Sequence, residues 1–172
     1  MSQHEHLGYR PCVGMMIINP QKLVWIGRRA AIKRRNEPEG SGHWWQMPQG
    51  GIDDGEEPAR AALRELSEET GIASSDIEVL AESSDWLYYD LPEDKIGKAW
   101  GGGYRGQKQK WFLLRFTGRD EQINITPDDP NDIEFDAWRW AQPDELVDLI
   151  VPFKREVYRA VLAEFVPLIR SS

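Results

Sequence analysis

The sequence predicts an α/β fold in which helices cover a mixed β-sheet. Segments with the apolar pattern of strands alternate along the chain with segments of helical pattern, which is typical of this class. The first two strand-like segments, residues 11–19 and 22–29, are separated only by the turn Asn19-Pro20-Gln21, so we expect a hairpin. A hairpin pairs its strands antiparallel, so the predicted sheet is not purely parallel.

A loop and a short strand lead from this hairpin to the first predicted helix. Residues 30–42 are polar and rich in turn residues, and a short apolar strand then precedes the turn signals Gly50-Gly51 and Asp54-Gly55. Pro58 suits the first position of a helix, and Gly71 suits the position just beyond its end. Four residues share the predicted inner face of this helix: Ala61, Ala62, Leu66 and Thr70.

The second half of the chain continues the alternation of strands and helices. Strand-like patterns occur at residues 77–91, 108–118 and 135–142. Residues 92–106 form a long Gly-rich loop of the kind that often carries function. Pro143 begins a short helix, and residues 153–169 have the spacing of an amphipathic helix. We expect Cys12 and the tryptophans to be core or sheet-packing residues: Trp44, Trp45, Trp111, Trp138 and Trp140.

Length and composition narrow the class of protein. The 172 residues suggest one domain, residues 1–172, and 40% of them are hydrophobic, which is enough for a core. The net charge of -8 argues against a protein that binds DNA or RNA through a broad basic surface, and it suits one that gathers metal cations. His4, His6 and His43 do not have the spacing of a metal site.

The expected compartment follows from cysteine content and from the apolar segments. Cys12 is the single cysteine, so no intrachain disulfide can form, as is usual inside cells. No apolar run reaches the roughly 18 residues of a membrane helix, and the N-terminal residues lack an apolar signal segment. We therefore expect a cytoplasmic protein with no membrane partner. The oligomeric state stays open, with a monomer expected.

Glutamates crowd one side of the predicted helix in the stretch RELSEET. On a helix, Glu65, Glu68 and Glu69 fall within an arc of about 100°, where like charges repel one another. Divalent cations prefer oxygen ligands and would cancel this repulsion. Arg64 lies four residues before Glu68 and can pair with it. The alternative is a solvated acidic face with no ligand.

Residues 50–72 favour the metal site over the solvated face, because they resemble the Nudix box. The pattern G-x5-E-x7-R-E-U-x-E-E-x-G-U is matched at every fixed position: Gly50, Glu56, Arg64, Glu65, Leu66, Glu68, Glu69, Gly71 and Ile72. The chain therefore resembles the Nudix hydrolases. That resemblance implies an α/β/α sandwich with a mixed sheet, and hydrolysis of a nucleoside diphosphate linked to another group, with Mg²⁺ or Mn²⁺.

The resemblance also implies roles for the residues of the box. Glu65, Glu68 and Glu69 would bind two or more metal ions, and the carbonyl of Gly50 would add an oxygen. A second carboxylate of the box, Glu56, would be structural and pair with Arg64.

The expected chemistry is attack of water on a polyphosphate. Metal ions neutralise the phosphate charge and lower the pKa of bound water, and a carboxylate takes the proton. The catalytic residues would be Glu65, Glu69 and Glu134, with Glu134 a further metal ligand or base. Glu65 and Glu134 are both candidates for the base. By position alone, Glu134 could also be a surface residue before a strand.

Five further segments resemble one subgroup of the family, the bacterial RNA pyrophosphohydrolases and the related asymmetric dinucleoside tetraphosphate hydrolases. They are residues 8–14, 45–53, 106–114, 134–140 and 152–158. The former convert the 5′-triphosphate end of RNA to a monophosphate, which promotes mRNA decay, and release pyrophosphate. The latter split diadenosine tetraphosphate into ATP and AMP. A third reading, a non-catalytic Nudix module that binds nucleotides, conflicts with the intact box.

The same resemblance implies the residues that contact the substrate. Phe153 would stack on the terminal base beside Lys154, unless it is a core residue of the last helix. Arg10 would clamp the base or the first phosphates. The other expected phosphate contacts, which could equally be solvated side chains, are Arg28 or Arg29, Tyr89, Lys108 and Lys110.

Two loops could add contacts to the substrate. Residues 30–43 carry Lys33, Arg34 and Arg35, which would form a basic rim for RNA or a solvated insertion. In the Gly-rich loop, Trp100 or Tyr104 could stack on a second base.

Overall fold

A pair of long parallel strands forms the centre of the sheet in this computed structural model, which describes residues 6–30 and 44–171. β1 (Gly8–Ile18) and β7 (Tyr104–Phe116) pair along the whole length of β1. The other strands of the described residues are β2 (Val24–Arg29), β3 (Trp45–Gln46), β4 (Gln49–Gly51), β5 (Ile77–Glu82), β6 (Leu87–Asp90) and β8 (Phe135–Ala141). Their pairings are antiparallel, so the sheet is mixed, as predicted.

The edge of β1 that faces away from β7 has two different partners. At its middle, Cys12, Val13 and Gly14 pair with β4, whereas Ile18 at its end pairs with β2. β2 in turn pairs with β3 and β8. β4 and β8 therefore belong to separate branches of the sheet.

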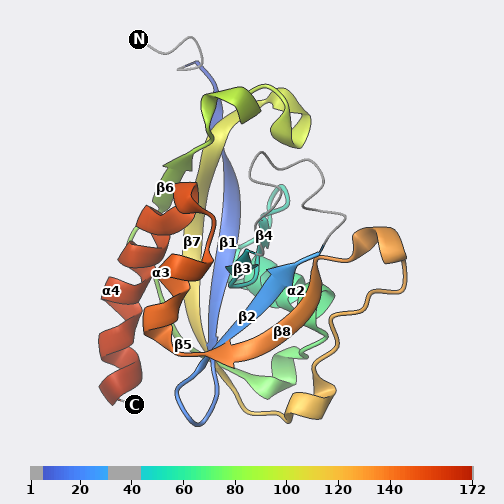
Figure 1. The fold of residues 1–172 in the computed structure, drawn as a ribbon, viewed down its shortest axis with the longest axis vertical. Coiled ribbons are helices and arrows are strands. Elements are labelled where there is room, and N and C mark those ends of the chain that lie inside the picture. The colour runs from blue at the N-terminus through green and yellow to red at the C-terminus, as the bar shows by residue number, and fades with distance from the viewer. Residues whose placement is uncertain (1–5, 31–43, 172) are drawn as a thin grey trace.

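Helices cover both faces of the sheet, which confirms the predicted fold class (Figure 1). α2 (Pro58–Thr70) packs on one face, and α3 (Leu146–Leu149) and α4 (Arg155–Ser171) pack on the other. Successive side chains of β1 point into the two cores alternately. Met16 and Ile18 belong to the core under α4, and Met15 and Ile17 belong to the core under α2. This alternation is the period of two of a strand with both faces buried.

The predicted first hairpin and first helix are both present. The side chain of Asn19 accepts hydrogen bonds from the N–H groups of Gln21 and Leu23, each at 3.0 Å, and closes the turn between β1 and β2. α2 begins at Pro58 and ends at Thr70, and the next residue, Gly71, caps it with a φ of 71°, a left-handed conformation that favours glycine.

The single strand predicted at residues 77–91 is wrong, because it is divided into β5 and β6. The hydroxyl of Ser83 accepts the Trp111 N–H at 3.0 Å and donates to the Asp85 carbonyl at 3.0 Å, so a side chain replaces one step of the ladder. β7 also begins earlier than the predicted residue 108. At Gly106 a Cβ would lie 2.0 Å from the Tyr89 carbonyl oxygen, so glycine allows this close strand pairing.

Other predicted features can be placed along the rest of the chain. The amphipathic helix begins at Arg155, after a 3-10 turn at Pro152–Lys154. Cys12 and the predicted packing tryptophans contact the two cores or lie within them. Among the described helices, none is long and apolar enough to cross a membrane. His4, His43 and the basic residues Lys33, Arg34 and Arg35 lie outside the described residues.

Candidate active site

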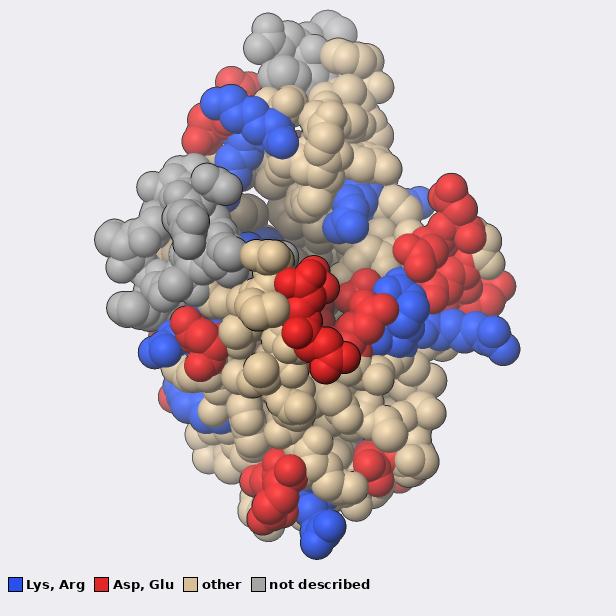
Figure 2. Space-filling model, turned by 90° about the vertical axis from the view of Figure 1, so that its right-hand side faces the viewer, with Lys and Arg blue, Asp and Glu red and all other residues tan. Residues whose placement is uncertain are grey.

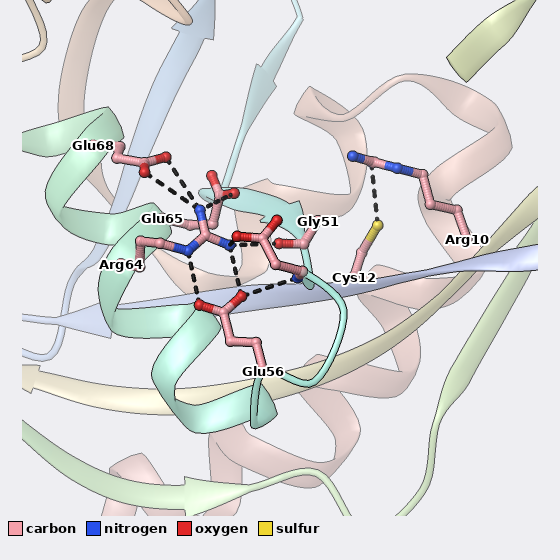
Figure 3. Close-up of polar contacts among 8 residues, drawn as sticks. Arg10, Cys12, Gly51, Glu56, Arg64, Glu65 and Glu68 are labelled. Atoms are coloured by element: carbon pink, nitrogen blue, oxygen red, sulfur yellow. Dashed lines mark hydrogen bonds and ion pairs between the residues drawn. The ribbon is translucent and has the colours of Figure 1, made fainter. Parts of the chain in front are cut away.

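Arg64 joins the start of the box to the glutamate helix (Figure 3). Its guanidinium donates two hydrogen bonds to Glu56, both at 2.8 Å, and one to the Gly51 carbonyl at 2.9 Å. The same group donates to Glu65 at 2.9 Å and to Glu68 at 3.3 Å. The guanidinium of Arg64 thus fixes α2 against β4, and its charge partly offsets the repulsion among the glutamates.

Glu56 is the structural carboxylate of this network, and the predicted pair with Arg64 is present. It also accepts the Asp53 N–H at 3.0 Å, which closes the turn before α2. The Arg64 guanidinium and this N–H lower the pKa of Glu56 to about 2.

Glu69 carries an oxygen that is buried without a partner. Its Oε2 atom is sealed from solvent and has no hydrogen bond within the described structure. Burial, with the nearby charges of Glu134 and Glu65, raises the pKa of Glu69 well above its usual range. Burial also raises the pKa of Glu65, although Arg64 opposes this. Glu65 thus has a cationic partner in Arg64, whereas Oε2 of Glu69 has none among the described side chains.

Gly50 leaves the space that the Glu65 carboxylate occupies. A Cβ at position 50 would lie 2.1 Å from Cδ of Glu65, so any larger residue would collide with this carboxylate. β4 holds Gly50 opposite Val13 of β1. The first residue of the box therefore supplies the space for a carboxylate, in addition to the carbonyl that the sequence predicts as a ligand.

A cavity of about 340 Å³ lies between the two branches of the sheet and has an acidic and a basic side. Its acidic residues are Glu65, Glu69 and Glu134, and its basic residues are Arg10, Arg29 and Lys154. Arg29 and Glu134 meet at 3.0 Å. Glu68 instead lines an adjoining hollow that also contains Asp128, Asp129 and Asp132, which sequence reasoning missed.

Charged side chains of both signs gather on the face of the molecule shown in Figure 2. Acidic side chains lie at its middle, below a hollow, and basic side chains lie near the hollow. The net charge of -8 thus does not prevent a local basic site.

A small aromatic pocket adjoins the basic side of the cavity. Phe153, Trp44 and Lys95 line it together with Arg29 and Lys154, which also line the larger cavity. Phe153 is half-buried against the core, with Nζ of Lys95 at 5.0 Å and Nζ of Lys154 at 5.9 Å from its ring centroid. Phe153 therefore packs against the core and also lines a pocket, so both alternatives expected from the sequence describe part of its position.

Several predicted phosphate contacts lie away from this cavity. Nζ of Lys108 lies 4.8 Å from the ring centroid of Trp86, and Lys110 donates to the Ser83 carbonyl at 3.0 Å. Neither lysine lines the cavity, whereas Gln107 does. Alternate residues of a strand point to opposite faces, which separates Lys108 and Lys110 from Gln107. Their placement gives no support to a phosphate contact in this cavity.

Burial decides the placement of Tyr89, and strand alternation decides between Arg28 and Arg29. Tyr89 is 7% exposed and belongs to the core, and burial raises the pKa of its hydroxyl. Between the two arginines left open by the sequence, Arg29 lines the cavity and Arg28 pairs with Asp136 at 2.6 Å.

Two glutamines of the site, one half-buried and one buried, were not predicted to line it. Gln49 and Gln107 line the cavity, and the amide of Gln109 donates to them at 3.1 Å and 2.7 Å. The alternation of glutamine and lysine in GQKQK is a signal for one buried polar face that could have found Gln107.

Comparison with known proteins decides the family. A family model described as NUDIX domain matches residues 8–161. The chain belongs to the Nudix family. An RNA pyrophosphohydrolase of Novosphingobium aromaticivorans is 57% identical over 95% of this chain and 96% of its own. One of Agrobacterium fabrum is 55% identical over 94% of each chain.

A solved structure of similar fold shares far less sequence with the chain. The Ap4A hydrolase of C. elegans in a binary complex superposes with a TM-score of 0.61 at 18% identity, covering 92% of this chain and 98% of that one. This likeness shows the fold alone.

The residues present fit the divalent metal on which Nudix hydrolases generally depend. The sealed oxygen of Glu69 and the raised pKa values of Glu69 and Glu65 are what an oxygen site for a cation would produce without its ion. In the described residues, no three acidic, histidine or cysteine side chains converge as a ready cage. Glu65 and Glu68 point to Arg64 instead, so binding a cation requires them to turn.

Gly50→Ala should abolish most activity and keep the fold. The new methyl group would displace the Glu65 carboxylate, which can rotate away, and a misplaced catalytic group costs about 100-fold in rate. The measurement is kcat on a phosphoanhydride substrate together with thermal unfolding. Gly8→Ala is the control, because nothing lies within 4 Å of its Cβ position. Normal kcat in Gly50→Ala would contradict this role of Gly50.

Glu56→Gln should lower the stability of the fold at neutral pH. It should also reduce the further loss of stability that the protein shows as the pH is lowered. The pKa of Glu56 is lowered from 4.5 to about 2, so its stabilisation is present above pH 4.5 and is lost as the pH falls towards 2. The measurement is the denaturant midpoint between pH 7 and pH 2. Glu57→Gln is the control, since its side chain makes no capping hydrogen bond. Equal acid sensitivity of Glu56→Gln and the unmodified protein would argue against the pair.

Proposed function

We propose that this chain is an RNA pyrophosphohydrolase that converts the 5′-triphosphate end of RNA to a 5′-monophosphate with release of pyrophosphate, and so promotes mRNA decay. The observation that carries the proposal is the cavity with carboxylates on one side and Arg10, Arg29 and Lys154 on the other. A polyphosphate chain needs such an arrangement, because its oxygens bind both metal ions and fixed cations. The names of the relatives at 57% and 55% identity agree with this substrate.

The proposed metal ligands lie on the acidic side of the cavity and beside it. Glu65, Glu68, Glu69 and Glu134, with the Gly50 carbonyl, would hold two or more Mg²⁺ or Mn²⁺ ions. When bound, these ions neutralise phosphate charge and acidify the attacking water. Glu65 or Glu134 would take the proton of that water.

The proposed substrate contacts lie on the basic side. Arg10, Arg29 and Lys154 would bind phosphate oxygens, and Phe153 would stack on the first base in the pocket that adjoins them. These two pockets share Arg29 and Lys154, so the proposed base contact lies next to the proposed phosphate contacts. We place the enzyme in the cytoplasm, acting as one Nudix domain and as a monomer.

A second candidate is hydrolysis of diadenosine tetraphosphate to ATP and AMP. One observation favours it: Trp100 lines the cavity in addition to the aromatic pocket at Phe153, so two bases could stack at one site.

The two substrates should be separated by their kcat/KM values, measured side by side. We expect triphosphorylated RNA to exceed diadenosine tetraphosphate, with both activities stopped by EDTA and restored by Mg²⁺. Glu69→Gln is the inactive control, because it removes a proposed ligand. A higher value for diadenosine tetraphosphate would replace the first proposal with the second, and turnover in EDTA would overturn the metal mechanism.

Phe153→Ala should raise KM for triphosphorylated RNA by about tenfold, the scale of one lost base–aromatic stack. Phe153→Leu serves as the control, since leucine preserves apolar packing against the core and lacks the ring face. Both variants should therefore show the raised KM, and only Phe153→Ala should lose much thermal stability. If Phe153→Leu has normal KM, the residue is a packing residue only.

A further inference from the structure

Trp100 is held in an unusual backbone conformation beside the cavity. Its φ of 50° and ψ of 41° lie in the left-handed region, which a bulky side chain rarely adopts. Gly101 and Gly102 follow with φ of 76° and 82°. Such strain persists only where surrounding contacts maintain it, and it is frequent at functional sites.

The indole of Trp100 contacts a charged residue of the site. Its ring centroid lies 5.5 Å from Cζ of Arg10, which is cation–π distance. Trp100 and Arg10 both line the cavity that contains Glu65, Glu69 and Glu134. Tyr104 packs on the indole with a centroid distance of 6.4 Å.

The other neighbours of Arg10 leave its charge uncompensated. Nη1 donates to Sγ of Cys12 at 3.5 Å (Figure 3), and burial raises the pKa of that thiol to about 11, so it is neutral. Nη2 lies 2.5 Å from where a Cβ of Gly51 would be, a contact that glycine permits. Within the described residues, Arg10 makes no ion pair with a carboxylate. Its cation is oriented by uncharged neighbours and remains available to an anion.

We propose that Trp100 is a positioning residue, which holds the guanidinium of Arg10 towards the cavity so that it binds the phosphates of the substrate. In this role Trp100 acts through Arg10, which lies over one face of the indole. The inference rests on the proposed function only for the nature of the anion, a polyphosphate.

The loop before β7 sets the position of the indole. At Gly102 a Cβ would lie 2.7 Å from the carbonyl oxygen of Gly97, which is backbone and cannot yield cheaply. The positive φ of Gly102 adds strain for any other residue. Gly103, the next residue, has a φ of -88° and nothing within 4 Å of its Cβ position. The chain therefore offers one substitution that should shift Trp100 and an adjacent one that should not.

The test is a double-mutant cycle on the binding of inorganic tripolyphosphate, measured by calorimetry with Mg²⁺ present. Trp100→Ala should weaken binding by about fivefold, the scale of a partly desolvated cation–π contact. Arg10→Ala should weaken binding more, and the double variant should be no weaker than Arg10→Ala. Trp100→Phe should restore part of the affinity. The experiment contains no RNA. It therefore still tests the role of Trp100 if the proposal that the enzyme acts on RNA fails.

A second route reaches the same contact without changing either side chain. Gly102→Ala should reproduce the weaker tripolyphosphate binding of Trp100→Ala, and Gly103→Ala should bind normally. Thermal unfolding of each variant verifies that the fold is intact.

Three outcomes would overturn the proposal. The losses in Trp100→Ala and Arg10→Ala could multiply, which would show that the residues act independently. Gly102→Ala could bind tripolyphosphate normally with the fold intact. Trp100→Ala could weaken diadenosine tetraphosphate but leave tripolyphosphate unchanged, which would make the indole a platform for a base.

Discussion

The site depends on the guanidinium of Arg64. It bonds to a turn, a strand and a helix at once, through Glu56, the Gly51 carbonyl and Glu65. α2 is thereby fixed at an angle and height that bring its glutamates to the edge of β4. Without this link, three carboxylates on one helix would repel one another and would have no reason to face the sheet. The pair of Glu56 and Arg64 thus supports the glutamates of α2 that face the cavity, Glu65 and Glu69.

The branched edge of β1 then supplies the space for chemistry. β4 carries the glycines on one branch, and β2 and the residue before β8 carry Arg29 and Glu134 on the other. Arg29 and Glu134 share one branch and pair at 3.0 Å, whereas Arg10 on β1 makes no ion pair with Glu65 or Glu69 of α2 within the described residues. Such separation matters, since a direct pairing of every acid with every base would leave no charge for metal or phosphate.

Sequence reasoning predicted the architecture, and the features that it did not predict have physical causes. The box specifies a turn and a helix through local rules, so Pro58, Gly71 and the Glu56–Arg64 pair could be read directly. The break between β5 and β6 depends on one hydroxyl, that of Ser83, reaching a strand far along the chain. The phosphate contacts expected of Lys108, Lys110 and Tyr89 required knowledge of which face of the sheet holds the cavity, and composition does not contain this.

The parallel pairing of β1 with β7 has a consequence for biosynthesis. Arg10 stands opposite Gln107, so the two sides of the cavity come from segments distant along the chain. Parallel strands of this kind add long-range contacts, which form slowly and late in folding. A ribosome must therefore finish β7 before the nascent chain can assemble its cavity.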